Sequence, residues 1–146
     1  MIRIENYSDQ YFLDVVKLVE NFHKEAVGEY DELFEPASLI ETIKNNNPKH
    51  CFLLIVDNVC QGIIFGIVVK SMISERYMFQ EVIWYVNESF RKYGVKLLKE
   101  TEKVLKSTGI SVMMMAVLEN SKTAKLKRFY ERLGFKPIET HFIRNL

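Results

Sequence analysis

Residues 81–98 combine a glycine and several basic side chains where an apolar, strand-like run gives way to a helical pattern. Arg91, Lys92 and Lys96 place positive charge around Gly94. The first turn of a helix leaves backbone N–H groups without intrahelical acceptors and carries the positive end of the helix dipole. Glycine supplies either a left-handed backbone angle or a missing Cβ that allows close approach. The segment therefore predicts an anion site suited to a phosphate, with a purely conformational glycine as the alternative.

Charge is divided unevenly along the chain, although the formal net charge is only +1. Residues 1–90 carry 7 Lys and Arg against 14 Asp and Glu, whereas residues 91–136 carry 12 against 4. A basic segment that begins at the predicted anion site suits a polyanionic ligand, and the acidic half suits a cationic one. Nucleic acid is a weaker candidate partner, because the whole chain is near neutral and contains no dense Lys/Arg run with interleaved aromatic residues.

The elements that position this turn follow from hydrophobic spacing and from Pro, Gly and Asn signals. A tight hairpin is expected at Asp57 and Asn58, between two apolar, β-branched runs. Gly62 and Gly66 suggest bulges or close packing in the second of these runs. The central β-α-β should be parallel and right-handed. Helices are expected at about residues 8–23, 36–44, 95–108 and 123–133, and Gly109 is expected to end the third of them. Strands are expected at 2–6, 50–57, 59–69, 77–86, 110–118, 135–138 and 141–145.

Composition indicates one compact domain, because 146 residues with 48% hydrophobic content can bury a sufficient core. No apolar run is long enough to cross a bilayer, and the first residues lack a secretory pattern, so a cytoplasmic location is expected. Cys51 and Cys60 look like buried thiols. No metal is expected, since His23, His50 and His141 are far apart in the sequence.

A second marker, Arg-Phe-Tyr-Glu-Arg-Leu-Gly-Phe at residues 128–135, follows the anion turn by one strand and one helix. Together the two segments resemble the GNAT superfamily of acetyl-CoA-dependent N-acetyltransferases, and the element order extends the resemblance over essentially the whole chain. The matching positions are Val86, Arg91, Gly94, Leu97 and Leu98 in the family's Val-x-Pro-Glu-x-Arg-Gly-x-Gly-x-Gly-like segment, and Phe129, Tyr130, Gly134 and Phe135 in its Phe-Tyr-x-x-x-Gly-Phe element.

The chain departs from the family pattern at several positions. Glu88 stands where the family usually has proline, and Lys92 and Lys96 stand at flanking glycine positions. The family often has an asparagine seven residues before the tyrosine. Here that position is Thr123 and the nearest asparagine is Asn120, so both are candidates beside the cofactor.

The resemblance implies a GNAT-like acyl-CoA N-acyltransferase fold of the α/β class, with a mixed sheet of about seven strands flanked by about four helices. It also implies that the pyrophosphate of acetyl-CoA lies on the backbone of the anion turn. The pantetheine arm would pair with the preceding strand as an extra strand would. The cofactor-binding residues implied in this way are Trp84, Tyr85, Val86, Arg91, Lys92, Tyr93, Gly94, Val95 and Lys96.

Tyr130 is the residue that the resemblance implies as general acid, because a phenol can protonate the departing thiolate. A core tyrosine is the alternative. Glu81 is the candidate base, as the one acidic residue in an otherwise apolar strand, and period-2 alternation places it on a face with Ile83 and Tyr85. A carboxylate at a strand edge is the alternative there. The alternative bases are His23 and an acidic loop, since that region borders the acceptor site in the family; the acidic residues of the loop are Glu25, Glu29, Asp31 and Glu32. His23 and Glu29 are also candidates for substrate binding.

The resemblance implies an enzyme that transfers acetyl from acetyl-CoA directly to an amine in a ternary complex. The rivals are a non-catalytic acyl-CoA-binding module and a nucleic-acid-modifying enzyme on the same fold. A small metabolite, a polyamine, an antibiotic, a protein N-terminus and a lysine all stay open as acceptors. A homodimer is an expectation from the family alone, and no membrane partner is expected.

Overall fold

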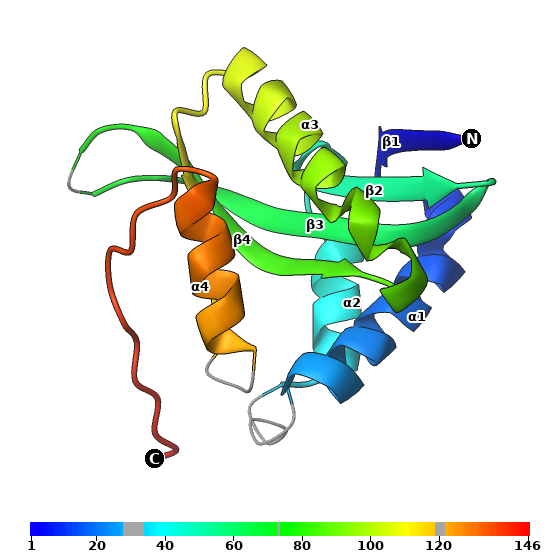
Figure 1. Ribbon diagram of the computed structural model, residues 1–146, viewed down its shortest axis with the longest axis horizontal. Coiled ribbons are helices and arrows are strands. Elements are labelled where there is room, and N and C mark those ends of the chain that lie inside the picture. The colour runs from blue at the N-terminus through cyan, green and yellow to red at the C-terminus, as the bar shows by residue number, and fades with distance from the viewer. Residues whose placement is uncertain (28–33, 73, 119–121) are drawn as a thin grey trace. The chain divides into compact units, whose positions relative to one another are not determined.

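The computed structural model describes residues 1–27, 34–72, 74–118 and 122–146. These residues form an N-terminal unit, Met1–Ala116, and a C-terminal unit, Val117–Leu146. The N-terminal unit contains a sheet with helices α1, α2 and α3, and the C-terminal unit contains helix α4 (Figure 1).

The N-terminal unit is built on a mixed sheet whose strand order is β1-β2-β3-β4-β5. The first three pairings are antiparallel, and β4 pairs with β5 in parallel across the connection through α3. The α/β class and the mixed sheet agree with the prediction. The strands are β1 Ile2–Asn6, β2 Cys51–Val56, β3 Val59–Lys70, β4 Tyr77–Val86 and β5 Val112–Met114.

Four α-helices occur in the described residues, as expected from the spacing of apolar residues. Helices α1 and α2 pack on one face of the sheet, and α3 packs on the other (Figure 1). Helix α1 continues directly into a π-helical turn at its C-terminal end. The helices are α1 Phe12–Phe22 with the π-helix His23–Val27, α2 Pro36–Asn45, α3 Gly94–Ser107 and α4 Thr123–Arg132.

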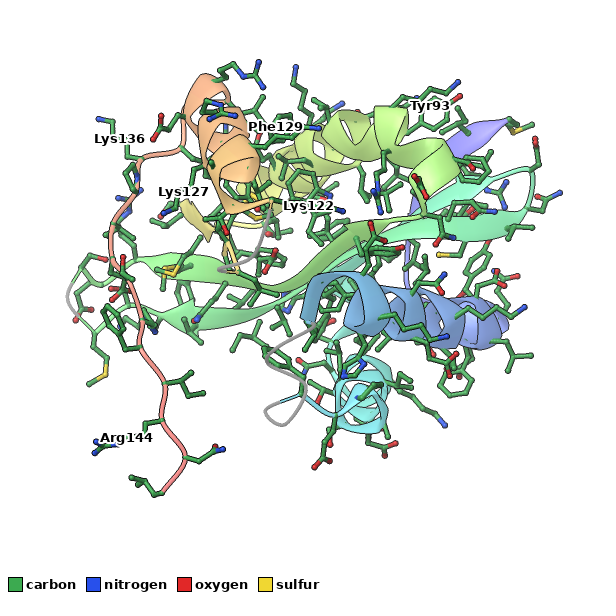
Figure 2. The ribbon with its side chains drawn as sticks, turned by 60° about the horizontal axis from the view of Figure 1, so that its bottom comes forward. Tyr93, Lys122, Lys127, Phe129, Lys136 and Arg144 are labelled. Atoms are coloured by element: carbon green, nitrogen blue, oxygen red, sulfur yellow. The ribbon has the colours of Figure 1, made fainter. Side chains whose placement is uncertain are left out.

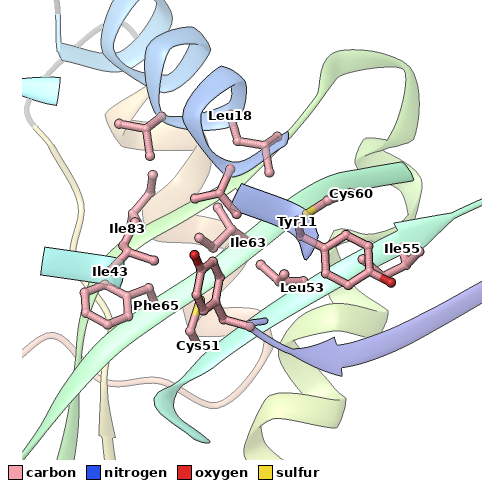
Figure 3. Packing of buried hydrophobic residues seen from close by; sticks show 13 residues of the cluster. Tyr11, Leu18, Ile43, Cys51, Leu53, Ile55, Cys60, Ile63, Phe65 and Ile83 are labelled. Carbon is pink, nitrogen blue, oxygen red and sulfur yellow. The ribbon is translucent and has the colours of Figure 1, made fainter. Parts of the chain in front are cut away.

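The core fills the space between the sheet and the helices α1 and α2 (Figure 3). Phe65 and Ile83 from neighbouring strands meet Leu18 and Val19 of α1 in this cluster. On the other face, the buried residues of α3 include Leu97, Leu98 and Leu105. Burial of each such side chain contributes about 1.5–3 kcal/mol. Both faces of the central strands are therefore covered, which fixes the position of β4 and of the turn that follows it.

The hairpin between β2 and β3 turns at Asp57 and Asn58, whose φ angles are +49° and +68°. Positive φ at both central residues is the geometry of a type I′ turn, and Asp and Asn tolerate it better than most residues. The predicted two-residue hairpin is confirmed.

Two parts of the predicted sheet are wrong. The expected strand at 110–118 is limited to Val112–Met114, and residues 135–146 contain no strand, so the sheet has five strands in the described residues and not about seven. Ile138, Phe142 and Ile143 in this stretch are from 70% to 94% exposed. Pro137 also cannot donate to a ladder. No helix among the described residues has the length and apolar character needed to cross a membrane.

Candidate functional site

Strand β4 runs past the end of β5. It pairs with β3 as far as Val86, but its ladder with β5 covers only Met78–Gln80. All three residues of β5, Val112–Met114, belong to this ladder. An extended ligand that carries amide groups can bind beside a strand by backbone pairing. The part of β4 beyond the ladder, Glu81–Val86, leads into the basic turn.

A β-bulge in the β3–β4 pairing lies next to the end of this ladder. Phe65 pairs with Ile83, whereas the next residue, Gly66, pairs with Glu81, so Val82 is the extra residue of β4. A Cβ on Gly66 would come within 2.5 Å of the Phe79 ring, so only glycine fits there. The predicted irregularity at Gly66 is confirmed.

The bulge corrects one expectation for Glu81. Gly66 and Phe65 are neighbours on β3 and face opposite sides of the sheet. Glu81 therefore shares a face with Gly66, and the expectation that it shares a face with Ile83 and Tyr85 is wrong. Period-2 alternation fails at this point because the extra residue shifts its phase.

The carboxyl group of Glu81 is suited to proton transfer. It is half-buried, and within the described residues no hydrogen bond or ion pair reaches it. Burial raises its pKa to about 8, because the charged form loses hydration without gaining a partner. A carboxyl group whose pKa lies near neutrality can both accept and return a proton.

Replacing Glu81 by glutamine is expected to stabilise the protein at high pH and not at low pH. The folded state holds the Glu81 proton up to a pKa of about 8, whereas an unfolded chain releases it near 4.5. The stability of the wild type should therefore fall as pH rises from about 4.5 to about 8. The stability of the variant should not fall in this range for this reason, because glutamine does not titrate. Thermal unfolding at pH 5 and pH 9 measures the effect, with the exposed Glu88→Gln as control. An equal change in Tm at both pH values would contradict the raised pKa.

Asn87 fixes the exit from β4. Its backbone N–H donates to the carbonyl oxygen of Gln61 at 2.9 Å, and its side-chain Nδ2 donates to Gln61 Oε1 at 2.8 Å. Its Oδ1 accepts from Asn21 Nδ2 of α1 at 3.2 Å. Strand β3 and helix α1 thus hold the residue from which the anion turn starts.

The predicted anion turn is a 3₁₀ helix, Glu88–Tyr93, that runs directly into α3 at Gly94. Figure 2 shows Tyr93 at this junction. Gly94 has φ −60° and is helical, so the suggested left-handed angle is wrong. A Cβ on Gly94 would lie 3.8 Å from side-chain atoms of Trp84 and Val86, which is ordinary van der Waals contact. Neither the backbone angle nor the space for a Cβ therefore requires glycine at this position.

Arg91 is the best-anchored cation of the turn. Its Nε donates to the carbonyl oxygen of Val86 at 3.2 Å, and its guanidinium forms an ion pair with Glu25 of the π-helix. The guanidinium carbon lies 5.8 Å from the ring centroid of Tyr85, whose hydroxyl donates to Glu25 at 2.8 Å. Burial and this hydrogen bond raise the pKa of Tyr85. The other cation of this turn, Lys92, also lies near an aromatic ring, with its ammonium 5.1 Å from the Tyr93 ring centroid.

The structure thus brings together some predicted residues and leaves others outside the described part of the chain. Trp84, Tyr85 and Val86 lie at the end of β4, and residues 91–96 span the end of the 3₁₀ helix and the start of α3. Gly94 is close to Trp84 and Val86. His23 begins the π-helix that carries Glu25. Glu29 and Asn120 lie outside the described residues.

Glu25 is the residue whose role was missed. It was grouped with the acidic loop, but it belongs to a helical turn and pairs with the anion turn. No sequence spacing signals this contact, because 66 residues separate Glu25 from Arg91.

In the C-terminal unit, the Phe-Tyr-x-x-x-Gly-Phe element forms a closed helix end. Gly134 has φ +90°, and the Phe135 N–H donates to the Tyr130 carbonyl oxygen at 3.0 Å, as in a Schellman motif. This turn places the Phe135 ring 5.4 Å from that of Tyr130. Tyr130 is buried, and the adjacent Phe129, labelled in Figure 2, lies 6.3 Å from it between ring centroids. At the start of α4, the Thr123 hydroxyl donates to the Leu118 carbonyl oxygen at 2.8 Å.

Comparison with known families identifies the chain. A model of the acetyltransferase (GNAT) family matches residues 16–135, which include the β4–α3 turn and the motif on α4. The chain belongs to this family. As a GNAT protein it is an acyltransferase. Within the described residues, no group of three or more His, Cys, Asp or Glu side chains is arranged to hold a metal ion.

Solved structures of GNAT proteins share the fold of this chain. The ribosomal-protein-alanine N-acetyltransferase from Brucella melitensis biovar Abortus 2308 is 11% identical, with a TM-score of 0.77 and coverage of 100% of this chain and 99% of that one. An aminoglycoside acetyltransferase from an uncultured soil metagenomic sample, in complex with sisomicin, is 16% identical, with a TM-score of 0.72 and coverage of 99% and 96%.

The aminoglycoside N-acetyltransferase AAC(6')-Iy in complex with CoA is 14% identical, with a TM-score of 0.71 and coverage of 100% and 95%. At these identities the likeness shows the fold alone. The comparison with curated protein sequences found no match.

Proposed function

We propose that residues 1–146 form one N-acetyltransferase domain that transfers acetyl from acetyl-CoA to an amine by direct attack in a ternary complex. The observation that supports this best is the end of the β4–β5 ladder at Gln80, ahead of a basic turn at the start of α3. A neighbour in fold binds CoA, and other neighbours are named for acetylating aminoglycosides or a ribosomal protein's alanine. A small-molecule or peptide amine is therefore the proposed acceptor class.

The turn at Glu88–Tyr93 and the first residues of α3 would hold the diphosphate of acetyl-CoA. The helix dipole and Arg91 supply the positive potential, with the exposed Lys92 and Lys96 beside it. The missing Cβ of Gly94 would let the diphosphate approach the backbone closely. Val95, half-buried, follows in the first turn. In this proposal the pantetheine arm runs along the backbone of Trp84–Val86, where the ladder with β5 has ended.

Two residues of the chain would move the protons. Glu81 would take a proton from the acceptor amine, for which its pKa of about 8 is suited. The amine nitrogen then bonds to the acetyl carbonyl carbon as the carbon–sulfur bond breaks. Tyr130 would donate its phenolic proton to the departing sulfur, and the proton held by Glu81 would return to solvent.

The cysteines favour direct transfer over an acetyl-cysteine intermediate. Cys51 and Cys60 are buried in the sheet core. Burial raises the pKa of Cys60 to about 12 and also raises that of Cys51. The thiolate is the reactive form of cysteine, and neither thiol forms it readily near neutral pH.

Acetyl-CoA binding followed by a thiol-release screen tests the proposal. Acetyl-CoA should raise Tm, because it binds the folded state, and free thiol should appear with at least one class of amine acceptor. The screen includes diamines, aminoglycosides and peptides with a free N-terminus or lysine. Binding without thiol release from any amine would indicate a non-catalytic module. Salt-sensitive binding of DNA or RNA in place of acetyl-CoA would indicate a nucleic-acid enzyme.

A further inference from the structure

Glu25, Tyr85 and Arg91 form a polar cluster where the π-helix after α1 meets the end of β4. The Glu25 carboxylate accepts from the Tyr85 hydroxyl at 2.8 Å and forms an ion pair with Arg91. All three residues belong to the N-terminal unit. The side chains of Glu25 and Arg91 are 31% and 40% exposed, so the pair is accessible to a solvated ligand.

We propose that Glu25 limits cofactor affinity by competing with the diphosphate for Arg91. This inference rests on the proposed function, because it requires the diphosphate to bind at the Glu88–Tyr93 turn. Arg91 would serve as the internal counter-ion of Glu25 and as the counter-ion of the cofactor.

Glu25 is not needed to place Arg91. The Arg91 Nε already donates to the Val86 carbonyl oxygen, and the guanidinium lies over the Tyr85 ring. These two contacts come from β4 itself, so they hold the arginine beside the turn without the carboxylate. A guanidinium has five N–H donors, and one is used by Val86. Loss of the Glu25 charge would therefore leave Arg91 in place with more donor capacity for a phosphate.

The carboxylate charge opposes an incoming diphosphate. Glu25 contacts the same guanidinium that the diphosphate would use, which brings like charges close together on one cation. When the diphosphate binds, either the Glu25–Arg91 ion pair breaks or the Glu25 carboxylate stays close to the diphosphate and repels it. Both effects weaken binding. The same cost applies to coenzyme A after the transfer, so Glu25 would favour release of that product as well.

Glu25→Gln tests this competition, since glutamine keeps the shape and removes the charge. Calorimetric titration with coenzyme A and with 3′-dephospho-coenzyme A, both of which contain the diphosphate, measures the affinity. We expect the variant to bind both compounds about threefold to fivefold more tightly at low salt. The effect is modest because a partly exposed ion pair contributes little free energy. The gain should shrink as salt screens the charges. Glu20→Gln, at an exposed position on α1, is the matched control and should not tighten binding.

The outcomes separate this inference from the function on which it rests. Equal affinity in wild type and Glu25→Gln, weaker binding in the variant, or equal tightening in Glu20→Gln would overturn the competition and leave the acetyltransferase proposal standing. Failure of the wild type to bind either compound would overturn both.

A second measurement, on the wild type, tests the inference even if Glu25→Gln does not fold. The NMR resonance of the Arg91 Nε–H group should shift on addition of coenzyme A, because its guanidinium would exchange Glu25 for the diphosphate. An unchanged resonance in a protein saturated with coenzyme A would overturn the inference.

Discussion

Tyr130→Phe is expected to lower kcat by about 100-fold or more while leaving acetyl-CoA affinity nearly unchanged. The substitution removes the phenolic proton that would be donated to the departing sulfur. It preserves the ring that packs against Phe129 and Phe135, so the end of α4 should keep its structure. Steady-state thiol release with the best acceptor from the screen gives kcat, and titration with acetyl-CoA gives the affinity.

The control for Tyr130→Phe is Tyr77→Phe, which deletes the same atom from an exposed tyrosine at the start of β4. It should leave kcat unchanged. An unchanged kcat in Tyr130→Phe would remove Tyr130 from the mechanism and support its alternative role as a core tyrosine. A large fall in the Tm of Tyr130→Phe would also support the role of a core tyrosine, because a proton used only in catalysis contributes little to stability.

Local signals in the sequence were sufficient for much of the N-terminal unit. The Asp57-Asn58 turn, the irregularity at Gly66 and the glycine that ends α3 at Gly109 were each predicted from residue type. Gly109 has φ +86°, a conformation that other residues rarely adopt. These features depend on a few adjacent residues, and sequence reasoning is most informative at that scale.

The errors arose where pairing partners decide the structure. Residues 135–145 alternate in a strand-like manner, but alternation does not specify an edge on which to pair. At Glu81 the residue type suggested a candidate base, whereas the face on which the side chain lies depends on the extra Val82. The bulge was inferred from Gly66 on the partner strand, and only the pairing register shows which residue of β4 is extra.

In the candidate site, too, local features were predicted from the sequence and long-range contacts were not. The anion turn was found from Arg91 and Gly94 in the sequence, because both are local markers of a strand-to-helix turn. The pairing of Arg91 with Glu25 depends on a π-helix that extends α1 by five residues, and no pattern in the sequence marked it. The Tyr130 motif was identified from its resemblance to a family motif. The Schellman turn explains the spacing of its aromatic residues and glycine, because the turn brings Phe135 back to Tyr130.

Gly94→Leu is expected to reduce acetyl-CoA affinity by about 100-fold. The diphosphate is proposed to accept hydrogen bonds from backbone N–H groups at the start of α3, and a bulky side chain would keep it from approaching. Loss of two hydrogen bonds to a charged group costs about 3 kcal/mol, and this corresponds to about 100-fold in affinity. Titration with acetyl-CoA and thermal unfolding of the free protein are measured together, so that lost binding is distinguished from lost folding.

Gly94→Ala separates the requirement of the ligand from that of the fold. The new Cβ meets Trp84 and Val86 at 3.8 Å, and alanine favours a helix over glycine, so Tm should be unchanged or higher. Its affinity for acetyl-CoA should nevertheless fall, by less than in Gly94→Leu, because the methyl group intrudes on the approach to the backbone. Wild-type affinity in both variants would refute the diphosphate site at this turn, since the protein has room for the Cβ of alanine at this position. A graded loss of affinity at constant Tm would instead mean that the glycine is required by the cofactor and not by the helix.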